Sequence, residues 1–505
     1  MKTLFSTIVF ALSLLDYAYP NFLPGQNQNQ GYVFTHMLES QNSHKILKTA
    51  YRPPIIVHPG TNIQAQVDQN PEGSRFLIKA GVHRLQQIKP KNGNEFIGEP
   101  GAILSGAKLL KQFQKEGQYW VAVDQFQKNP VQGPCNGGPL TIPKGGCKFS
   151  EDLFIDDTPL LQVPQLSDVG PGRWFFDYNA NKIYFFDDPR NRKVETSVTR
   201  YAFVGPAGNV TIWRLTIEKY ANPSAEGAIQ AMNGDQGPLA ESWTVRNNEV
   251  RFNHGYGIRL GRGMRIFQNH IHHNGQLGIG GAGEQILIEH NEISYNNTQG
   301  FNWLLEGGGV KLVNTQDVTL RGNYVHHNVG PGLWADVDNV NILYEENRTA
   351  DNDGPGIFHE KSQRAVIRNN WSGRNGFGYP TWLVGAGILV SASSDVEIYG
   401  NTVWNNADGI GVVQGTQAVG KFGPHEVENI FIHDNSISMA TGHTGLAVKS
   451  QDPSFFLNRN IRFERNTYVL IGEEKGKFRW MNKILSETQW EAFGHDNGGA
   501  FIRTQ

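Results

Sequence analysis

Two carboxylates at matching places in neighbouring sequence phrases could do acid–base chemistry together. Asp336 closes the phrase GLWAD (332–336), and Glu360 closes the phrase GIFHE (356–360), 24 residues later. When a fold holds two carboxyl groups a few ångströms apart, their repulsion raises the pKa of one and leaves the other ionised. A proton donor beside an ionised carboxylate is the machinery that cleaves glycosidic bonds. The pair forms only if the fold brings these two positions side by side.

An internal repeat predicts such a fold. From residue 245 onward, two Asn residues five positions apart are followed by a Gly that opens an apolar strand, and uninterrupted repeats are 21 to 24 residues long. The Asn pairs are 248/253, 269/274, 291/296, 323/328, 347/352, 370/375 and 401/406. Asn at fixed offsets favours turns, and stacked Asn side chains can form hydrogen-bonded ladders. The period predicts a solenoid of parallel strands with one coil per repeat, because a leucine-rich repeat would show a Leu framework and a propeller needs a longer period.

The alternation of side chains within each predicted strand assigns the two acids to one face. With the strand-opening Gly as position zero, position one is apolar in most coils and faces the core, so positions two and four face outward. Asp336 and Glu360 both stand at position four of consecutive coils. Since coils stack at about 4.8 Å, we expect carboxyl oxygens within about 5–6 Å, near the ~5–5.5 Å of retaining glycosidases. The alternative is a solvated pair of surface acids.

Neighbouring outward positions and two longer connections, 297–308 and 376–386, could form the walls of a sugar site. The candidate substrate-binding residues are Trp334, Phe358, Lys311 and Arg259 at position two, and Trp303, Glu306 and Trp382 in the longer connections. Aromatic walls suit the CH faces of sugar rings. A Lys or Arg could bind a hydroxyl, hold a substrate carboxylate or keep Asp336 ionised. The alternative for each aromatic residue is packing of its loop onto the barrel.

His residues recur at the predicted turns, at positions 254, 272, 273, 326 and 327. We interpret them mostly as parts of the repeat, since their spacing does not define a ligand set. No metal or other cofactor is expected.

The chain resembles a known superfamily. The opening HPGTNIQAQVDQNPEGSRFLIKAGVHRL…FIGEPGAILSG, together with the repeat, resembles the right-handed parallel β-helix of pectate-lyase-like proteins from about residue 55 to 470. GLWAD followed one coil later by GIFHE, with an inserted β-sandwich, resembles the β-xylosidase family of glycoside hydrolases built on that fold. The resemblance implies that Asp336 is the nucleophile and Glu360 the general acid/base of a retaining mechanism.

Two other functions stay open. One is a polysaccharide lyase or C5-epimerase acting on uronate polymers, to which Lys311 and Arg259 could contribute, although an epimerase DPHE motif and an Arg cluster are absent. The other is a non-catalytic glycan-binding or surface β-helix protein. In each case the expected partner is an oligo- or polysaccharide. Nucleic acid is not expected, because the net charge is only −2 and there is no basic block.

The chain divides into six predicted segments. They are a signal peptide (1–19), a leader (20–54), the first β-helix coils (55–106), an inserted β-sandwich-like domain (107–200), the main β-helix (201–470) and a C-terminal cap (471–505). The insert contains a hairpin, FFDYNANKIYFF, whose aromatic residues alternate around a turn. The cap contains a short helix in LSETQWEAFGHD.

The first residues predict secretion. Lys2, the apolar run LFSTIVFALSLL and the following DYAYP have the order of a secretory signal, and the run is too short to span a bilayer. A secreted chain with two Cys residues around a Gly/Pro loop predicts a Cys135–Cys147 disulfide. Asn209, Asn296, Asn347 and Asn370 stand in N-glycosylation sequons.

Overall fold

The computed structural model describes residues 53–128, 145–234, 237–378, 382–415, 418–450, 452–472 and 476–504. They belong to one compact unit, Arg52–Gln505, of the two into which the chain divides. The predicted signal peptide, all but the last two residues of the leader, and Cys135 lie outside the described residues. The predicted Cys135–Cys147 disulfide therefore stays a prediction. Cys147, which is described, is buried.

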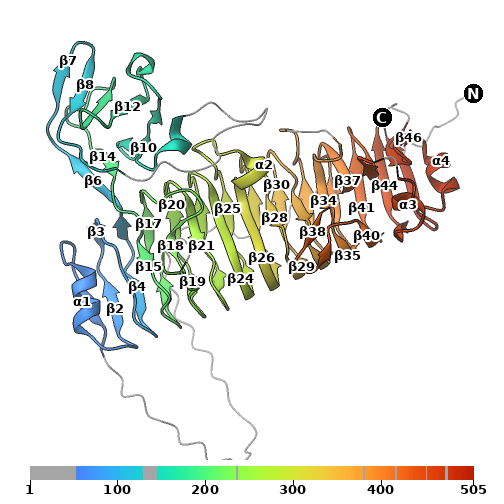
Figure 1. Ribbon diagram of the computed structural model, residues 1–505, viewed down its shortest axis with the longest axis horizontal. Helices are drawn as coiled ribbons and strands as arrows, with labels where there is room; N and C mark the ends of the chain where they lie inside the picture. The colour runs from blue at the N-terminus through green and yellow to red at the C-terminus, as the bar shows by residue number, and fades with distance from the viewer. Residues whose placement is uncertain are drawn as a thin grey trace, which may run out of the picture. The chain divides into compact units, whose positions relative to one another are not determined.

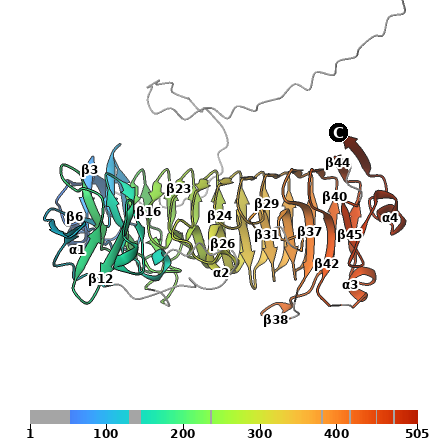
Figure 2. The ribbon, with the colours of Figure 1, turned by 90° about the horizontal axis from the view of Figure 1, so that it is seen from above.

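The described residues form a right-handed parallel β-helix with small antiparallel sheets, so the predicted fold class is confirmed (Figure 1). Figure 2 shows the successive coils of this unit following one another along the helix axis. Each full coil contributes one strand to each of three faces. Strands β24 and β26 continue round a corner and join faces 1 and 2 into one sheet of 23 strands.

Face 1 carries the predicted acids. Its strands are β15 (Phe203–Val204), β18 (Gly227–Gln230), β21 (Tyr256–Arg259), the first parts of β24 (Leu277–Glu289) and β26 (Gly308–Arg321), β28 (Leu333–Asp336), β31 (Ile357–Glu360), β34 (Ala386–Ser391), β37 (Asp408–Gln414), β42 (Thr444–Val448) and β45 (Phe478–Trp480), with β46 (Lys483–Leu485) antiparallel to β45.

Face 2 follows face 1 in each coil. Its strands are β1 (Ile55–Val57), β2 (Arg75–Ile78), β4 (Glu95–Gly98), β16 (Thr211–Trp213), β19 (Thr244–Arg246), β22 (Arg265–Phe267), the second parts of β24 and β26, β29 (Val340–Glu345), β32 (Gln363–Arg368), β35 (Ser394–Tyr399), β40 (Glu428–His433) and β43 (Ile461–Glu464).

Face 3 is a separate sheet of 13 strands. Its strands are β3 (Gly81–Arg84), β5 (Ala102–Ser105), β17 (Thr216–Glu218), β20 (Glu249–Arg251), β23 (His270–His272), β25 (Glu292–Ser294), β27 (Tyr324–His326), β30 (Arg348–Ala350), β33 (Trp371–Gly373), β36 (Thr402–Trp404), β41 (Ser436–Met439), β44 (Thr467–Ile471) and β47 (Ala500–Thr504).

The interior combines an apolar core with two ladders of Asn side chains. The predicted position-one residues, such as Leu333 and Ile357, are fully buried. The first ladder runs through Asn248, Asn269, Asn291, Asn323, Asn347, Asn370, Asn401, Asn435 and Asn466 to Asp496, each amide donating to the next side-chain oxygen at 2.7–3.0 Å.

The second ladder links Asn253, Asn274, Asn296, Asn328, Asn352, Asn375 and Asn406 at 2.9–3.0 Å. A side-chain amide both donates and accepts, so a stack of Asn satisfies itself without water. Three of the four sequon residues, Asn296, Asn347 and Asn370, are buried in the two ladders, whereas Asn209 is exposed.

Two antiparallel sheets lie between β5 and β15 in the sequence and form the insert at the first coils (Figure 1). One contains β10 (Thr158–Pro159), β9 (Leu153–Ile155), β14 (Val194–Ser197) and β6 (Ala107–Leu110); the other contains β11 (Leu161–Gln162), β12 (Arg173–Asp177), β13 (Lys182–Phe185), β8 (Tyr119–Ala122) and β7 (Gln114–Glu116). A 3-10 turn, Gly145–Lys148, lies in the connection from β8 to β9, and a second one, Leu166–Asp168, lies between β11 and β12 of the same sheet. The pairing of β12 with β13 confirms the predicted hairpin.

Short helices close the ends and one connection. Helix α1 (Ile63–Gln69) precedes β2, α2 (Trp303–Glu306) lies in the connection before β26, and α3 (Ser454–Leu457) precedes β43. The predicted C-terminal helix is α4 (Glu487–Ala492), which starts with a capping box between Ser486 and Gln489 and buries Trp490. Over the described ranges, none of the helices has the length and apolarity that crossing a bilayer requires.

Candidate active site

Strands β28 and β31 are neighbours on face 1, and their register sets Asp336 opposite Glu360. Both side chains point outward at the ends of their strands and are 14% and 17% exposed. The Lys361 ammonium lies 3.2 Å from Glu360 Oε1 and 3.8 Å from Asp336 Oδ1. These two oxygens are therefore no more than about 7 Å apart, which leaves room for the spacing of a retaining pair and excludes most of the inverting range.

The two carboxyl groups have different electrostatic surroundings. Burial and the negative charge of Asp336 raise the pKa of Glu360, and this rise is only partly opposed by Lys361 and Lys311. Asp336 Oδ2 lies 3.1 Å from the buried ammonium of Lys311. Glu360 therefore holds a proton more tightly than an ordinary glutamate does, while Asp336 is the carboxylate that pairs with the buried ammonium.

Trp334 forms the floor of the site and is not an open sugar platform. It is almost fully buried, with the Lys311 ammonium 4.1 Å from one ring centre and the Phe358 ring stacked at 5.4 Å. In-register pairing places Lys311 and Phe358 on the strands to either side, so both faces of the indole are covered. Its Nε1–H donates to Glu360 Oε2 at 3.2 Å. The two faces of the indole are therefore closed to a stacked sugar, so a substrate contact with Trp334 stays a prediction for its edge, and the indole N–H holds the Glu360 carboxyl in place.

Glu306 is joined to the site through Lys311. The Lys311 ammonium lies 3.4 Å from Glu306 Oε1 and donates to the carbonyl of Leu305, both in the α2 connection. The hydroxyl of Tyr256 donates to Glu306 Oε2 at 2.8 Å. Tyr256, Glu306, Lys311 and Asp336 thus form one chain of polar contacts, which fixes the ammonium under the carboxylate. The sequence pattern did not point to Tyr256. Its ring lies over Gly280, where any side chain would collide with it, and its hydroxyl reaches Glu306 from there.

Three predicted substrate-binding residues are not brought to the acids. Arg259 stands two strands before Lys311 and donates to the carbonyl of Ala225. Trp303 is buried in its own connection, as loop packing requires. Trp382 is 45% exposed but lies next to Arg479 of β45, four strands beyond β31. Trp303 thus serves local packing, and Trp382 contacts a later coil instead of the two acids.

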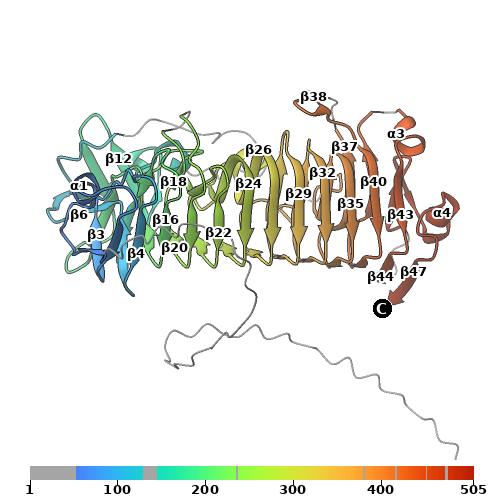
Figure 3. The same ribbon diagram turned by 90° about the horizontal axis from the view of Figure 1, so that it is seen from below.

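A hairpin that the repeat did not predict lies next to the coil that carries Asp336. Strands β38 (Val419–Gly420) and β39 (Gly423–Pro424) project from the helix after β37 (Figure 3). Asp338, two residues after Asp336, accepts hydrogen bonds from the backbone of Lys421 at 2.8 Å and from His425 at 3.1 Å. The hairpin is thereby tied back to the coil that carries Asp336. Its side chains are candidates for contacts with a bound ligand.

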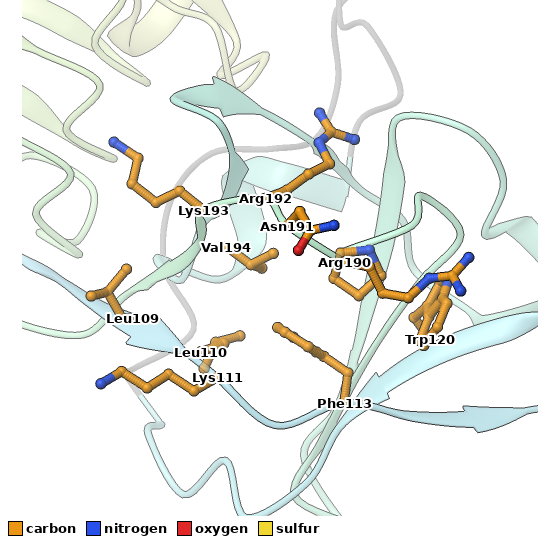
Figure 4. Close-up of a pocket in the computed structure, with 11 residues that line it drawn as sticks. Leu109, Leu110, Lys111, Phe113, Trp120, Arg190, Asn191, Arg192, Lys193 and Val194 are labelled. Carbon is orange, nitrogen blue, oxygen red and sulfur yellow. The ribbon is translucent and has the colours of Figure 1, made fainter.

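One hollow of the described residues lies away from the two acids. It has a volume of about 560 Å³ and lies on the insert between β6 and the chain after β13 (Figure 4). Its lining includes Lys111, Arg190, Arg192 and Lys193 but no carboxylate. Arg190, Arg192 and Lys193 each pair with an Asp at 2.5–2.7 Å, so most of this positive charge is compensated. The hollow therefore lacks the pair of carboxyl groups that glycoside hydrolysis ordinarily uses.

Comparisons with known proteins agree with the fold. Residues 228–403 match the family described as Right handed beta helix region. The structure is similar to that of XylC in complex with xylose, with 14% identity, a TM-score of 0.55, and coverage of 87% of this chain and 82% of that chain.

It is also similar to the A-module of the mannuronan C-5 epimerase AlgE4 of Azotobacter vinelandii, with 14% identity, a TM-score of 0.50, and coverage of 88% and 92%. At such identities the likeness is one of fold alone. No curated protein sequence matches the chain.

Proposed function

We propose that the chain is a secreted carbohydrate-active enzyme, and specifically a retaining glycoside hydrolase in which Asp336 is the nucleophile and Glu360 the general acid/base. One observation supports this most strongly. Two outward carboxyl groups lie on adjacent strands, one with a raised pKa and the other against a buried ammonium. Sheet stability alone does not favour like charges directly opposite each other.

The coupling between the acids accounts for both steps of a retaining reaction. In the first step, protonated Glu360 donates its proton to the leaving oxygen while Asp336 attacks the anomeric carbon and becomes an ester. The ester carries no charge, so one cause of the raised pKa of Glu360 disappears. Glu360 then stays ionised and takes a proton from the water that hydrolyses the ester. Because Asp336 lies one coil away, its charge and the loss of that charge let the Glu360 carboxyl group serve first as an acid and then as a base.

Lys361 controls access to the nucleophile. Asp336 Oδ1 is buried and accepts no hydrogen bond from the residues that the structure describes, and the Lys361 ammonium lies over it at 3.8 Å. The Lys361 side chain is 37% exposed and can swing into solvent. Substrate entry requires this movement, after which the ammonium is placed to bind a sugar hydroxyl at the edge of the site.

Chromogenic aryl glycosides test the proposal directly, with a β-xyloside first in the panel because XylC, which shares the fold, is described with bound xylose. Wild type should hydrolyse one of them, and Asp336→Ala and Glu360→Ala should lose that activity. Azide should restore turnover of an activated aryl glycoside by Glu360→Ala with retention of configuration, because a good leaving group needs no proton donor.

The matched control is Glu397→Gln, which alters a half-exposed acid on face 2. It should leave the rate unchanged. Hydrolysis that persists in both Ala variants would refute the roles assigned to Asp336 and Glu360.

A lyase or epimerase on uronate polymers is the second candidate. The specific observation in its favour is that Lys311 and Lys361 flank the acids, since a cation beside the sugar carboxylate lowers the barrier to removing the neighbouring proton. Uronate polymers that gain absorbance from an unsaturated product, or that exchange the C5 proton with solvent, would favour this candidate. Binding of glycans without turnover of either substrate class would favour a non-catalytic surface protein.

A further inference from the structure

A second cluster of reactive side chains lies on the outer surface of face 3, apart from the Asp336/Glu360 pair on face 1. In-register pairing places Glu249 of β20, His270 of β23 and Glu292 of β25 in one outward column. His272 stands two residues after His270 on the same strand and therefore points to the same side. The proposed hydrolysis uses none of these residues.

The distances within the cluster approach those of a metal site. His272 Nε2 lies 3.2 Å from Glu249 Oε1, and His270 Nε2 lies 3.8 Å from Glu292 Oε1. One ligand atom from each of Glu249, His270 and His272 lies within 4.8 Å of the other two, the one such group among the described residues. Nitrogen and oxygen ligands at about 2.0–2.1 Å from a tetrahedral ion are about 3.3 Å apart. A small rotation of the His270 ring, which is half-exposed, would bring all three to that spacing.

The surrounding contacts hold the cluster in the form that binds a metal ion. The Nδ1 atoms of His272 and His273 are 2.8 Å apart, so one of them donates to the other, and a proton on Nδ1 of His272 leaves its Nε2 free as a ligand. An ion bound between Glu249 and His272 would replace the present contact between His272 Nε2 and Glu249 Oε1.

We propose that Glu249, His270 and His272 bind a divalent first-row transition ion on face 3. Two imidazoles and one carboxylate suit Zn²⁺, and three protein ligands leave a fourth position for Glu292 or for water. Arg251 also donates to Glu249 Oε1, at 2.7 Å, but it keeps a second partner in Glu218 at 2.9 Å when the ion takes this oxygen.

The same face contains a built-in control. Glu292, His326 and His327 repeat the contacts of the first set, with a Glu–His distance of 3.2 Å and an Nδ1–Nδ1 distance of 2.8 Å. In the place of His270 stands Tyr324, whose ring stacks on His326 at 4.1 Å. The second set therefore has the same carboxylate and imidazole but lacks the third ligand. Comparing the two sets separates metal binding from simple hydrogen bonding within the repeat.

Calorimetry with ZnCl₂ and metal analysis after dialysis, on the full secreted chain stripped with chelator, test the proposal. Wild type should bind one zinc ion per chain. His270→Tyr, which makes the first set a copy of the second, should bind none, and Tyr324→His should bind two. His326→Gln, which alters only the second set, should keep the single ion. Zinc should also raise the unfolding temperature of wild type and leave that of His270→Tyr unchanged.

Two results would overturn the proposal. One is a wild type that retains no zinc, and the other is a His270→Tyr variant that retains it as tightly as wild type does. Should His270→Tyr fail to fold, His272→Gln removes another ligand and gives the same test. The cluster lies on a different face from Asp336 and Glu360. The zinc measurements can therefore support or refute the metal site whether or not the protein hydrolyses glycosides.

Discussion

The interior Asn ladders and the outer Asp336/Glu360 pair are two uses of the same geometry. Both place like side chains on successive coils about 4.8 Å apart. Inside, each amide donates to the next and accepts from the previous one, so the stack satisfies itself. Outside, two carboxylates can only accept, and they repel unless one takes a proton. Repetition therefore stabilises the Asn side chains, which can pair with one another, and raises the pKa of Glu360, whose carboxyl group cannot pair with that of Asp336 when both are ionised.

The end of the first ladder shows how many hydrogen-bond donors surround a buried carboxylate in the stack. Asp496 accepts from Asn466 at 2.7 Å through one oxygen and from Tyr468 and Trp490 at 2.7 and 2.8 Å through the other. It terminates the stack because it has nothing to donate. The two carboxyl groups of the Asp336/Glu360 pair share three donors, Lys311, Trp334 and Lys361.

Asp336→Asn should have the largest effect, because it turns the outer pair into an amide beside a carboxylate and removes the nucleophile. We expect kcat/KM for the best aryl glycoside to fall by about 10³-fold or more, which corresponds to about 4 kcal/mol of transition-state stabilisation. Stability should change less than activity, since the amide removes the repulsion of Glu360 but also the ion pair with Lys311. Steady-state rates and urea unfolding measure the two quantities. Activity within tenfold of wild type would contradict the assignment.

Asn347→Ala tests whether the first Asn ladder contributes to the stability of the folded protein. It removes the acceptor of Asn323 and the donor to Asn370, both of which stay buried. The loss of these buried hydrogen bonds, together with those from the Asn323 backbone N–H and to the Leu320 carbonyl, should lower the free energy of unfolding by about 2–4 kcal/mol. Urea unfolding measures this change, and Asn179→Ala, at an exposed position outside the left-handed region, should stay within about 0.5 kcal/mol of wild type. Equal midpoints for all three proteins would show that the ladder is not a source of stability.

Glu360→Gln should change how stability depends on pH. The folded-state pKa of Glu360 is raised, so its contribution to stability is complete below the unfolded-state value and is lost as pH rises through the folded-state value. A glutamine at this position cannot ionise, so Glu360→Gln does not lose stability in this way. The free energy of unfolding of the variant, relative to that of wild type, should therefore increase from pH 4 to pH 8.

Urea midpoints at the two pH values measure this change, and Glu345→Gln should show the opposite trend, because a hydrogen bond from Arg321 lowers the pKa of Glu345. The same trend in both variants would refute the cause assigned to the raised pKa of Glu360.

Lys361→Met should have the smallest effect. The positive charge of Lys361 lowers the pKa of Glu360, so removing it should raise that pKa and move the alkaline limb of the kcat/KM profile to higher pH. The pH profile of aryl glycoside hydrolysis measures the shift. Lys421→Met, on the hairpin, should leave the limb in place. A shift to lower pH would contradict the electrostatic role of Lys361.

The repeat made the fold and the opposition of Asp336 and Glu360 predictable, because period and alternation are properties of the sequence itself. The surroundings were not predictable in the same way. Lys361 follows the strand in a left-handed turn with φ of 44°, where alternation no longer tells which way a side chain points. Asp338 and His425 meet across 87 residues through a hairpin outside the repeat. Trp334 has the expected position, but only its neighbours on both sides reveal that its ring is covered.

The burial of three sequons in the ladders has a consequence for how the protein can be produced. In a secretory pathway that attaches N-glycans to the emerging chain, transfer to Asn296, Asn347 or Asn370 would compete with coil closure, because a glycosylated amide cannot enter the stack. Folded protein from such a host should carry sugar at Asn209 alone, as peptide mapping would show. Cells without this modification should give the higher yield, since every chain could then close its coils unhindered.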